Sequence, residues 1–188
     1  MKTILITSLL FAVSSPAAQF LVTFDTTAIL GNSGAVEIQF NPAVFPGAYQ
    51  PGAVTVTAFE LGAGSLGSIS SGPDGGASGT LPGPLVILNS DFYNGVVYNV
   101  TTFGSSASLL VDFTGLAYTA SGQTDLTTFS VTLIGSSSIT AVADLLGDSQ
   151  LDVSFSDPGV NFSEVPEPAT FALMALGLAA AVALRRRS

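Results

Sequence analysis

Short runs of β-branched and aromatic residues recur along most of the chain. Several place apolar and polar side chains at alternate positions, as in Val36-Glu37-Ile38-Gln39-Phe40, which is the pattern of a strand with one buried face. Gly, Asn, Pro, Ser and Asp occupy the intervals and favour turns. This pattern predicts an all-β fold, an antiparallel β-sandwich of about eight strands, at residues 20–24, 36–40, 54–59, 85–88, 96–100, 109–113, 129–133 and 151–155.

Two segments depart from this pattern. Residues 62–84 are rich in Gly and Pro, so we expect a long surface loop there around one weak strand at residues 66–69. Residues 141–147 predict a helical turn, the only helix expected outside the two ends of the chain.

The first residues have the three regions of a secretory signal peptide. Met1 and Lys2 supply positive charge, residues 4–13 are largely apolar, and mostly small residues follow. We therefore expect an N-terminal signal helix within residues 1–17, removed by cleavage after Ala17, or after Ala18 as the less favourable alternative. A first β-strand is disfavoured because the apolar residues would occupy both of its faces.

A second uncharged stretch runs from Ala169 to Leu184. As a helix it would be roughly 24 Å long, which is short of the ~30 Å hydrocarbon core of a typical bilayer, so the membrane would have to thin or flanking residues be drawn in. Arg185, Arg186 and Arg187 follow and indicate the cytoplasmic side. We expect a C-terminal transmembrane helix over residues 169–184. A buried helix of a soluble domain and a permanent single-span anchor are the alternatives.

Immediately before this stretch lie Val165, Pro166, Glu167 and Pro168. The two prolines fix φ near −65° and disfavour helix, so this segment is expected to be extended. The tetrapeptide at 165–168, the apolar stretch at 169–184 and the arginine cluster at 185–187, in this order, resemble the PEP-CTERM sorting signal of Gram-negative bacteria. That signal is the proposed substrate of exosortase, a membrane-embedded cysteine transpeptidase.

The resemblance implies a route for the protein. The general secretion machinery would export it to an inner-membrane intermediate held by residues 169–184, and exosortase would then cleave near Val165 to Pro168. The upstream domain would reach the cell surface or the exopolysaccharide matrix. The order of 24–26, 36–40, the Gly-rich stretch, 88–94 and 129–133 also looks like an uncharacterised group of β-rich PEP-CTERM proteins, which implies no activity.

Residues 18–164 then form one predicted domain, with a sorting signal at residues 165–188. All basic side chains lie outside this domain, whereas every acidic residue except Glu167 lies inside it, so the domain is more acidic than the whole-chain net charge of −9. Such a surface would repel nucleic acid and anionic lipid head groups, and we exclude both as partners of the domain. The chain has no Cys, so no disulfide can form.

The missing residue types also exclude most catalytic chemistry. Without His, Cys, Lys or Arg, residues 18–164 cannot form a Ser-His-Asp triad, a thiol nucleophile, a Schiff base or a histidine-ligated zinc site. Carboxylate pairs of the glycosidase kind remain possible in principle, but no spacing singles out a pair. We therefore predict that the protein is not an enzyme and needs no cofactor.

Calcium is the one metal that the sequence leaves open. Asp144, Asp148 and Asp152 lie close together in the chain, and carboxylate oxygens suit Ca²⁺. Their spacing matches no EF-hand loop, and carboxylates at turns and on a strand surface explain them equally well.

Two functional classes follow from these observations. The first is a non-catalytic surface or exopolysaccharide-matrix protein. The second is a carbohydrate-binding, lectin-like module, calcium-dependent or not, that would hold sugar through aromatic side chains and nearby carboxylates. Its aromatic candidates are Tyr49, Tyr93, Tyr98 and Tyr118.

Overall fold

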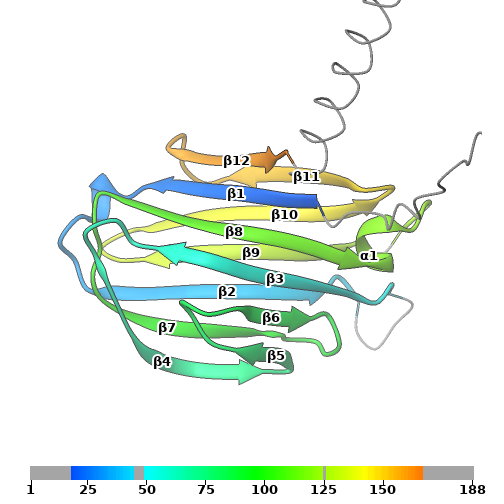
Figure 1. Cartoon of the computed structure of the whole chain (residues 1–188), viewed down its shortest axis with the longest axis horizontal. Helices are drawn as coiled ribbons and strands as arrows, with labels where there is room; N and C mark the ends of the chain where they lie inside the picture. The colour runs from blue at the N-terminus through cyan, green and yellow to red at the C-terminus, as the bar shows by residue number, and fades with distance from the viewer. Residues whose placement is uncertain (1–17, 45–48, 125, 167–188) are drawn as a thin grey trace, which may run out of the picture.

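The computed structural model describes residues 18–44, 49–124 and 126–166, which fold into two sheets packed face to face (Figure 1). One sheet contains β1 (Ala18–Asp25), β3 (Gly52–Glu60), β5 (Gly76–Gly79), β6 (Leu85–Leu88), β8 (Ser106–Gly115) and β12 (Val160–Val165). The other contains β2 (Gly34–Pro42), β4 (Ser65–Asp74), β7 (Gly95–Thr102), β9 (Thr127–Ile134), β10 (Ser138–Gly147) and β11 (Gln150–Phe155). Two single turns, η1 (Thr27–Ile29) and α1 (Leu116–Thr119), are helical.

All neighbouring strands in both sheets are antiparallel. The strand order is β12-β1-β8-β3-β6-β5 in the first sheet and β11-β10-β9-β2-β7-β4 in the second. This arrangement confirms the predicted all-β antiparallel sandwich.

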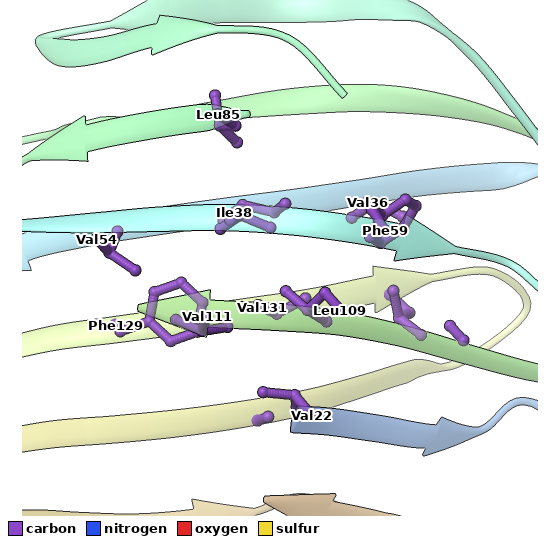
Figure 2. Close-up of a cluster of buried hydrophobic side chains, with 14 of the residues drawn as sticks. Val22, Val36, Ile38, Val54, Phe59, Leu85, Leu109, Val111, Phe129 and Val131 are labelled. Atoms are coloured by element: carbon purple, nitrogen blue, oxygen red, sulfur yellow. The ribbon is translucent and has the colours of Figure 1, made fainter. Parts of the chain in front are cut away.

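Side-chain alternation places the core between the two sheets. Along β9 every second residue is buried, and β8 and β10 follow the same period of two. Figure 2 shows the result, with Val54 and Val111 from the first sheet among the same buried cluster as Ile38 and Val131 from the second. Neither sheet can bury these side chains without the other.

Phe113 on β8 lies at the centre of an aromatic group in this core and is fully buried. Its ring centroid is 5.5 Å from that of Phe129 and 5.8 Å from that of Phe20. Phe40 and Tyr118 complete the group at 6.3 and 6.0 Å. These separations are typical of favourable aromatic pairs, and they join β1, β2, β8, β9 and α1.

The described residues contain twelve strands, so the prediction of about eight was too low. All eight predicted segments are strands, and the weak strand expected at 66–69 is part of β4. The additional strands are β5, β10 and β12. Most of residues 62–84 lie at the surface, although Leu81 is buried in the core. They are not a long loop, because β4 hydrogen-bonds to β7 and β5 to β6. The pairing of β4 is interrupted by four register shifts, which accommodate its glycines and Pro73.

The helical turn predicted at residues 141–147 was also wrong. This segment belongs to β10, in which Ile139, Ala141, Ala143 and Leu145 are buried in alternation. Ala is a good helix former, but two inward-facing Ala residues also suit a strand that lies opposite large side chains. In the β9–β10 pairing, Ala143 lies across from Phe129. The helical turn of this part of the chain is α1 instead.

The predicted signal helix and transmembrane helix both lie outside the described residues, so they stay predictions. Within residues 18–44, 49–124 and 126–166, no helix is sufficiently long and apolar to span a bilayer.

The tight β10–β11 turn yields a stability prediction. Gly147 has φ of +77°, and a Cβ there would overlap the carbonyl oxygen of Ala120. Gly31 has nearly the same φ, +78°, but open space around it. Gly31→Ala should therefore lower the free energy of unfolding by about 1–2 kcal/mol, the cost of left-handed backbone alone. Gly147→Ala should cost clearly more, as measured by urea unfolding of the 18–166 fragment. Equal losses would contradict the packing at this turn.

Candidate functional site at the end of β12

The last described strand, β12, lies at the edge of the first sheet. It pairs with β1 over six residue pairs, from Phe24↔Val160 to Gln19↔Val165. β1 in turn pairs with β8 on its other side. The strand that leads into Pro166 is therefore held to the sandwich along one edge only.

Side chains from both strands join β12 to the core. Val160 is buried, and Phe162 packs against the core with its ring centroid 5.3 Å from that of Phe20. Phe20 also contacts Phe113, so this contact connects the edge strand to the central aromatic group. In contrast, Asn161 and Glu164 are exposed.

A tight turn at residues 157–159 leads into β12. The Gly159 N–H donates to Asp157 Oδ1 at 2.8 Å, and the Asp25 N–H donates to the Gly159 carbonyl at 2.9 Å. A Cβ on Gly159 would come within 2.7 Å of the Asp25 Cβ, which explains the glycine. Hydrogen bonds from the Thr27 hydroxyl and N–H lower the pKa of Asp25.

Polar contacts surround the other end of β12. Gln19, opposite Val165, donates from Nε2 to Asp112 Oδ1 at 3.2 Å. Tyr118 of α1 donates from its hydroxyl to the Ser149 carbonyl at 3.2 Å. Its pKa is raised by burial and, to a smaller degree, by the carboxylate of Glu164. The charge of Glu164 on β12 is thus felt by Tyr118 of α1.

Proline explains why β12 ends at Val165. Pro166 has no N–H to donate to a sheet ladder, and it is exposed in the structure. Because Val165 still pairs with Gln19, no linker separates the sandwich from the first proline of the predicted processing motif. The predicted boundary between residues 164 and 165 lies between the last two residue pairs of the β1–β12 ladder, one residue before the strand ends.

The same end of the sandwich holds both termini of the described chain. β1 begins there at Ala18, the residue after the predicted cleavage bond, and β12 ends there (right-hand side of Figure 1). Since all neighbours are antiparallel, the described parts of the loops at 43–51, 89–94 and 116–126 and the turn at 148–149 lie there too. We call this the junction end.

Several predicted site residues lie outside the described part of the chain. These are Ala17, Glu167, Pro168 and the cluster Arg185, Arg186 and Arg187. Their assignments as cleavage, processing and topology residues stay predictions.

The three aspartates considered for calcium have separate roles. Asp144 and Asp152 face each other across the β10–β11 pair, and Asp144 Oδ1 accepts a 2.5 Å hydrogen bond from the Thr128 hydroxyl. Asp148 is in the exposed β10–β11 turn, with φ of +49°. Across the part of the chain that the structure describes, no group of three or more acidic side chains is placed to hold a metal ion.

The four tyrosines do not form one exposed surface. Tyr98 and Tyr118 are buried, and Tyr98 accepts a 2.9 Å hydrogen bond from the Leu81 N–H. Tyr93 is half-buried beside β2, where its hydroxyl donates to Glu37 Oε1 at 3.3 Å; burial and the Glu37 charge raise its pKa. Tyr49 is also half-buried. Two of the four are therefore unable to stack on a sugar.

Sequence reasoning missed β12 as a strand. The signal was present, because Val160 and Phe162 alternate with polar residues between Gly159 and Pro166. The segment is only six residues long and runs directly into the sorting motif, and no strand was predicted in it.

Because β12 pairs with one neighbour only, we expect it to open locally more readily than the central strands. The contact between Phe162 and Phe20 should oppose this opening. Phe162→Ala should remove part of the contact with Phe20 and accelerate amide exchange in β12 roughly tenfold, equivalent to about 1.4 kcal/mol, while β8 and β9 exchange little faster. Hydrogen-exchange mass spectrometry of the 18–166 fragment would measure this. Phe155→Ala, on an edge strand of the other sheet, is the control and should leave β12 unchanged. Equal acceleration of β8 in F162A would show that β12 does not open separately.

The arrangement of Asp144, Asp148 and Asp152 predicts that calcium does not stabilise the domain. A ligand that binds only the folded state raises Tm by mass action. We expect the Tm of the 18–166 fragment to be the same in millimolar calcium and in EDTA. A calcium-dependent rise that Asp148→Asn abolishes would contradict this prediction.

Comparison with known protein families finds a match that begins in β12 and continues beyond it. Residues 164–187 match the family described as the PEP-CTERM protein-sorting motif. No curated protein and no solved structure matches the chain. The match begins at Glu164, inside β12, and includes the predicted motif and the apolar stretch that follows. The chain therefore carries a PEP-CTERM protein-sorting motif at residues 164–187, the mark of an exported protein that exosortase sorts to the cell surface.

Proposed function

We propose that the protein is a non-catalytic component of the cell surface or exopolysaccharide matrix of a Gram-negative bacterium. Its C-terminal segment anchors it transiently in the inner membrane, and exosortase then processes it at Pro166-Glu167-Pro168. The mature product is the β-sandwich, which begins near Ala18, with the residues up to the processing site near Pro168. The observation that carries this proposal is the direct succession of a folded edge strand and the sorting motif.

The geometry of β12 supports processing at this position. Protease-type enzymes commonly bind their substrates as extended strands that add to a sheet edge. The residues before the motif are already extended, and the outer edge of β12 has no neighbouring strand in the described sheet. Pro166, the first residue after the strand, is exposed. An enzyme could thus reach the motif without unfolding the core.

The composition of the domain supports a non-catalytic role. Residues 18–164 lack the side chains that supply most nucleophiles and bases, so acid–base chemistry would depend on carboxylates alone. Of these, Asp25, Asp112 and Asp144 accept hydrogen bonds from neighbouring side chains, as strand and turn carboxylates do. In the lectin-like alternative, Tyr98 and Tyr118 could not contact sugar, because both side chains are buried.

Mass spectrometry of the surface form tests the sorting proposal. In a host that contains exosortase, we expect the protein recovered from the cell surface or medium to end near Pro168 and to lack Arg185 to Arg187. Pro166→Ala should leave most of the chain uncleaved in the membrane fraction, because the rigid extended motif is lost.

Pro158→Ala is the matched control, because Pro158 is an exposed proline just before β12 and outside the motif. It should be processed like the unaltered protein. Recovery of peptides containing Arg185 to Arg187 from the surface pool would count against exosortase processing. Glycan-array binding by the 18–166 fragment would instead favour the carbohydrate-binding module.

A further inference from the structure

Large apolar side chains gather at the junction end. Among the described residues, eight large hydrophobic side chains are exposed. The three at or towards the opposite end are Leu30, Ile134 and Phe155. The other five come from separate segments at the junction end and are Val44, Leu88, Phe92, Leu116 and Leu146.

The positions of these five follow from the topology. Val44 follows β2, Leu88 ends β6 and Phe92 lies in the loop to β7; Leu116 begins α1 and Leu146 is near the end of β10. Strands β2, β6 and β10 end at the junction end, β7 begins there, and α1 follows the end of β8 there; Figure 1 shows this end on the right-hand side. Phe92 is the most exposed of the five, at 71%.

Single exposed apolar residues are normal on a protein surface, and their gathering at one end is what requires an explanation. Loops at the end of a sandwich are usually polar because they face water. Here three connections contribute one large apolar side chain each, Val44, Phe92 and Leu116, and Leu88 and Leu146 lie at the strand ends beside them. This end is thus suited to an environment less polar than water.

The length of the chain beyond β12 indicates what that environment is. Only Glu167 and Pro168 separate Pro166 from Ala169, where the uncharged stretch begins. Even fully extended, three residue steps span at most about 11 Å. If residues 169–184 lie in the bilayer, as the proposed function requires, the junction end is held at the membrane surface and the rest of the sandwich extends away from it.

We propose that the junction end is a membrane-contacting surface, which binds the interfacial region of zwitterionic phospholipid while the chain is anchored. This proposal depends on the membrane intermediate in the proposed function. Phe92 and Leu116 are the central contacts, because the interface of a bilayer accommodates aromatic and aliphatic side chains on its apolar side. Tethering makes the contact intramolecular, so even a weak contact is populated.

The charges at this end select the lipid. Asp91, Asp148 and Glu164 are exposed there, and residues 18–164 contain no basic side chain to offset them. Anionic lipids would therefore repel this surface, and salt would screen the repulsion. The surface fits zwitterionic head groups, and its contact should weaken as the anionic fraction of the membrane rises.

Because the chain has no Trp, the fluorescence of a single introduced Trp reports only on the position at which it is placed. The exported form, residues 18–188, would carry Phe92→Trp and be reconstituted into phosphatidylcholine vesicles, some containing brominated lipid. We expect bromolipid to quench the indole at position 92 several-fold more than the indole of the matched control Leu30→Trp. Leu30 is 57% exposed at the opposite end of the sandwich. Replacing part of the lipid with phosphatidylglycerol should reduce the quenching at low salt, and added salt should restore it.

Vesicle flotation separates the two proposals. If the F92W chain floats and its indole is quenched by aqueous acrylamide as strongly as in L30W, the membrane contact is overturned and the anchored intermediate survives. If the indole is shielded from acrylamide but not quenched by bromolipid, a second copy covers this surface and the proposal is also overturned. A chain that does not float overturns both the contact and the anchored intermediate.

Discussion

The structure depends on the burial of one face of each sheet against the other. Residues 18–164 have no Cys and no basic side chain, so neither disulfides nor side-chain ion pairs can stabilise the domain. Its carboxylates repel one another, and that repulsion opposes the compact state. Stability therefore comes from apolar packing and the backbone ladders. The aromatic group around Phe113 is the part of this core that connects both sheets and both terminal strands.

The sequence was sufficient to predict the fold class and most central strands, because strict alternation in segments such as 36–40 and 129–133 has only one structural explanation. It was insufficient where tertiary pairing decides the conformation. Ala141 and Ala143 favour helix locally, yet their pairing with Val131 and Phe129 of β9 makes them strand residues. The Gly-rich segment around Gly72 forms strands because its backbone satisfies the exposed edges of β6 and β7, which no local pattern reveals.

The candidate site, too, could be predicted only in part from the sequence. Val165 and Pro166 could be identified as part of a sorting motif from residue order alone, since the motif is a linear signal. That Val165 is paired with Gln19, and that Ala18 begins the neighbouring strand, depends on contacts about 140 residues apart in the chain. Ala18 and Val165 thus lie at neighbouring strand ends, which the linear order of the residues does not reveal.

The position of β12 also has a mechanical consequence. Because β1 begins and β12 ends at the same side, tension applied between Ala18 and Val165, across the two strands, would load the β1–β12 hydrogen bonds one after another and not all together in shear. Such geometry yields at low force. A force in that direction would separate β12 from β1 from Val165 towards Val160 before it disturbed β8 or the second sheet.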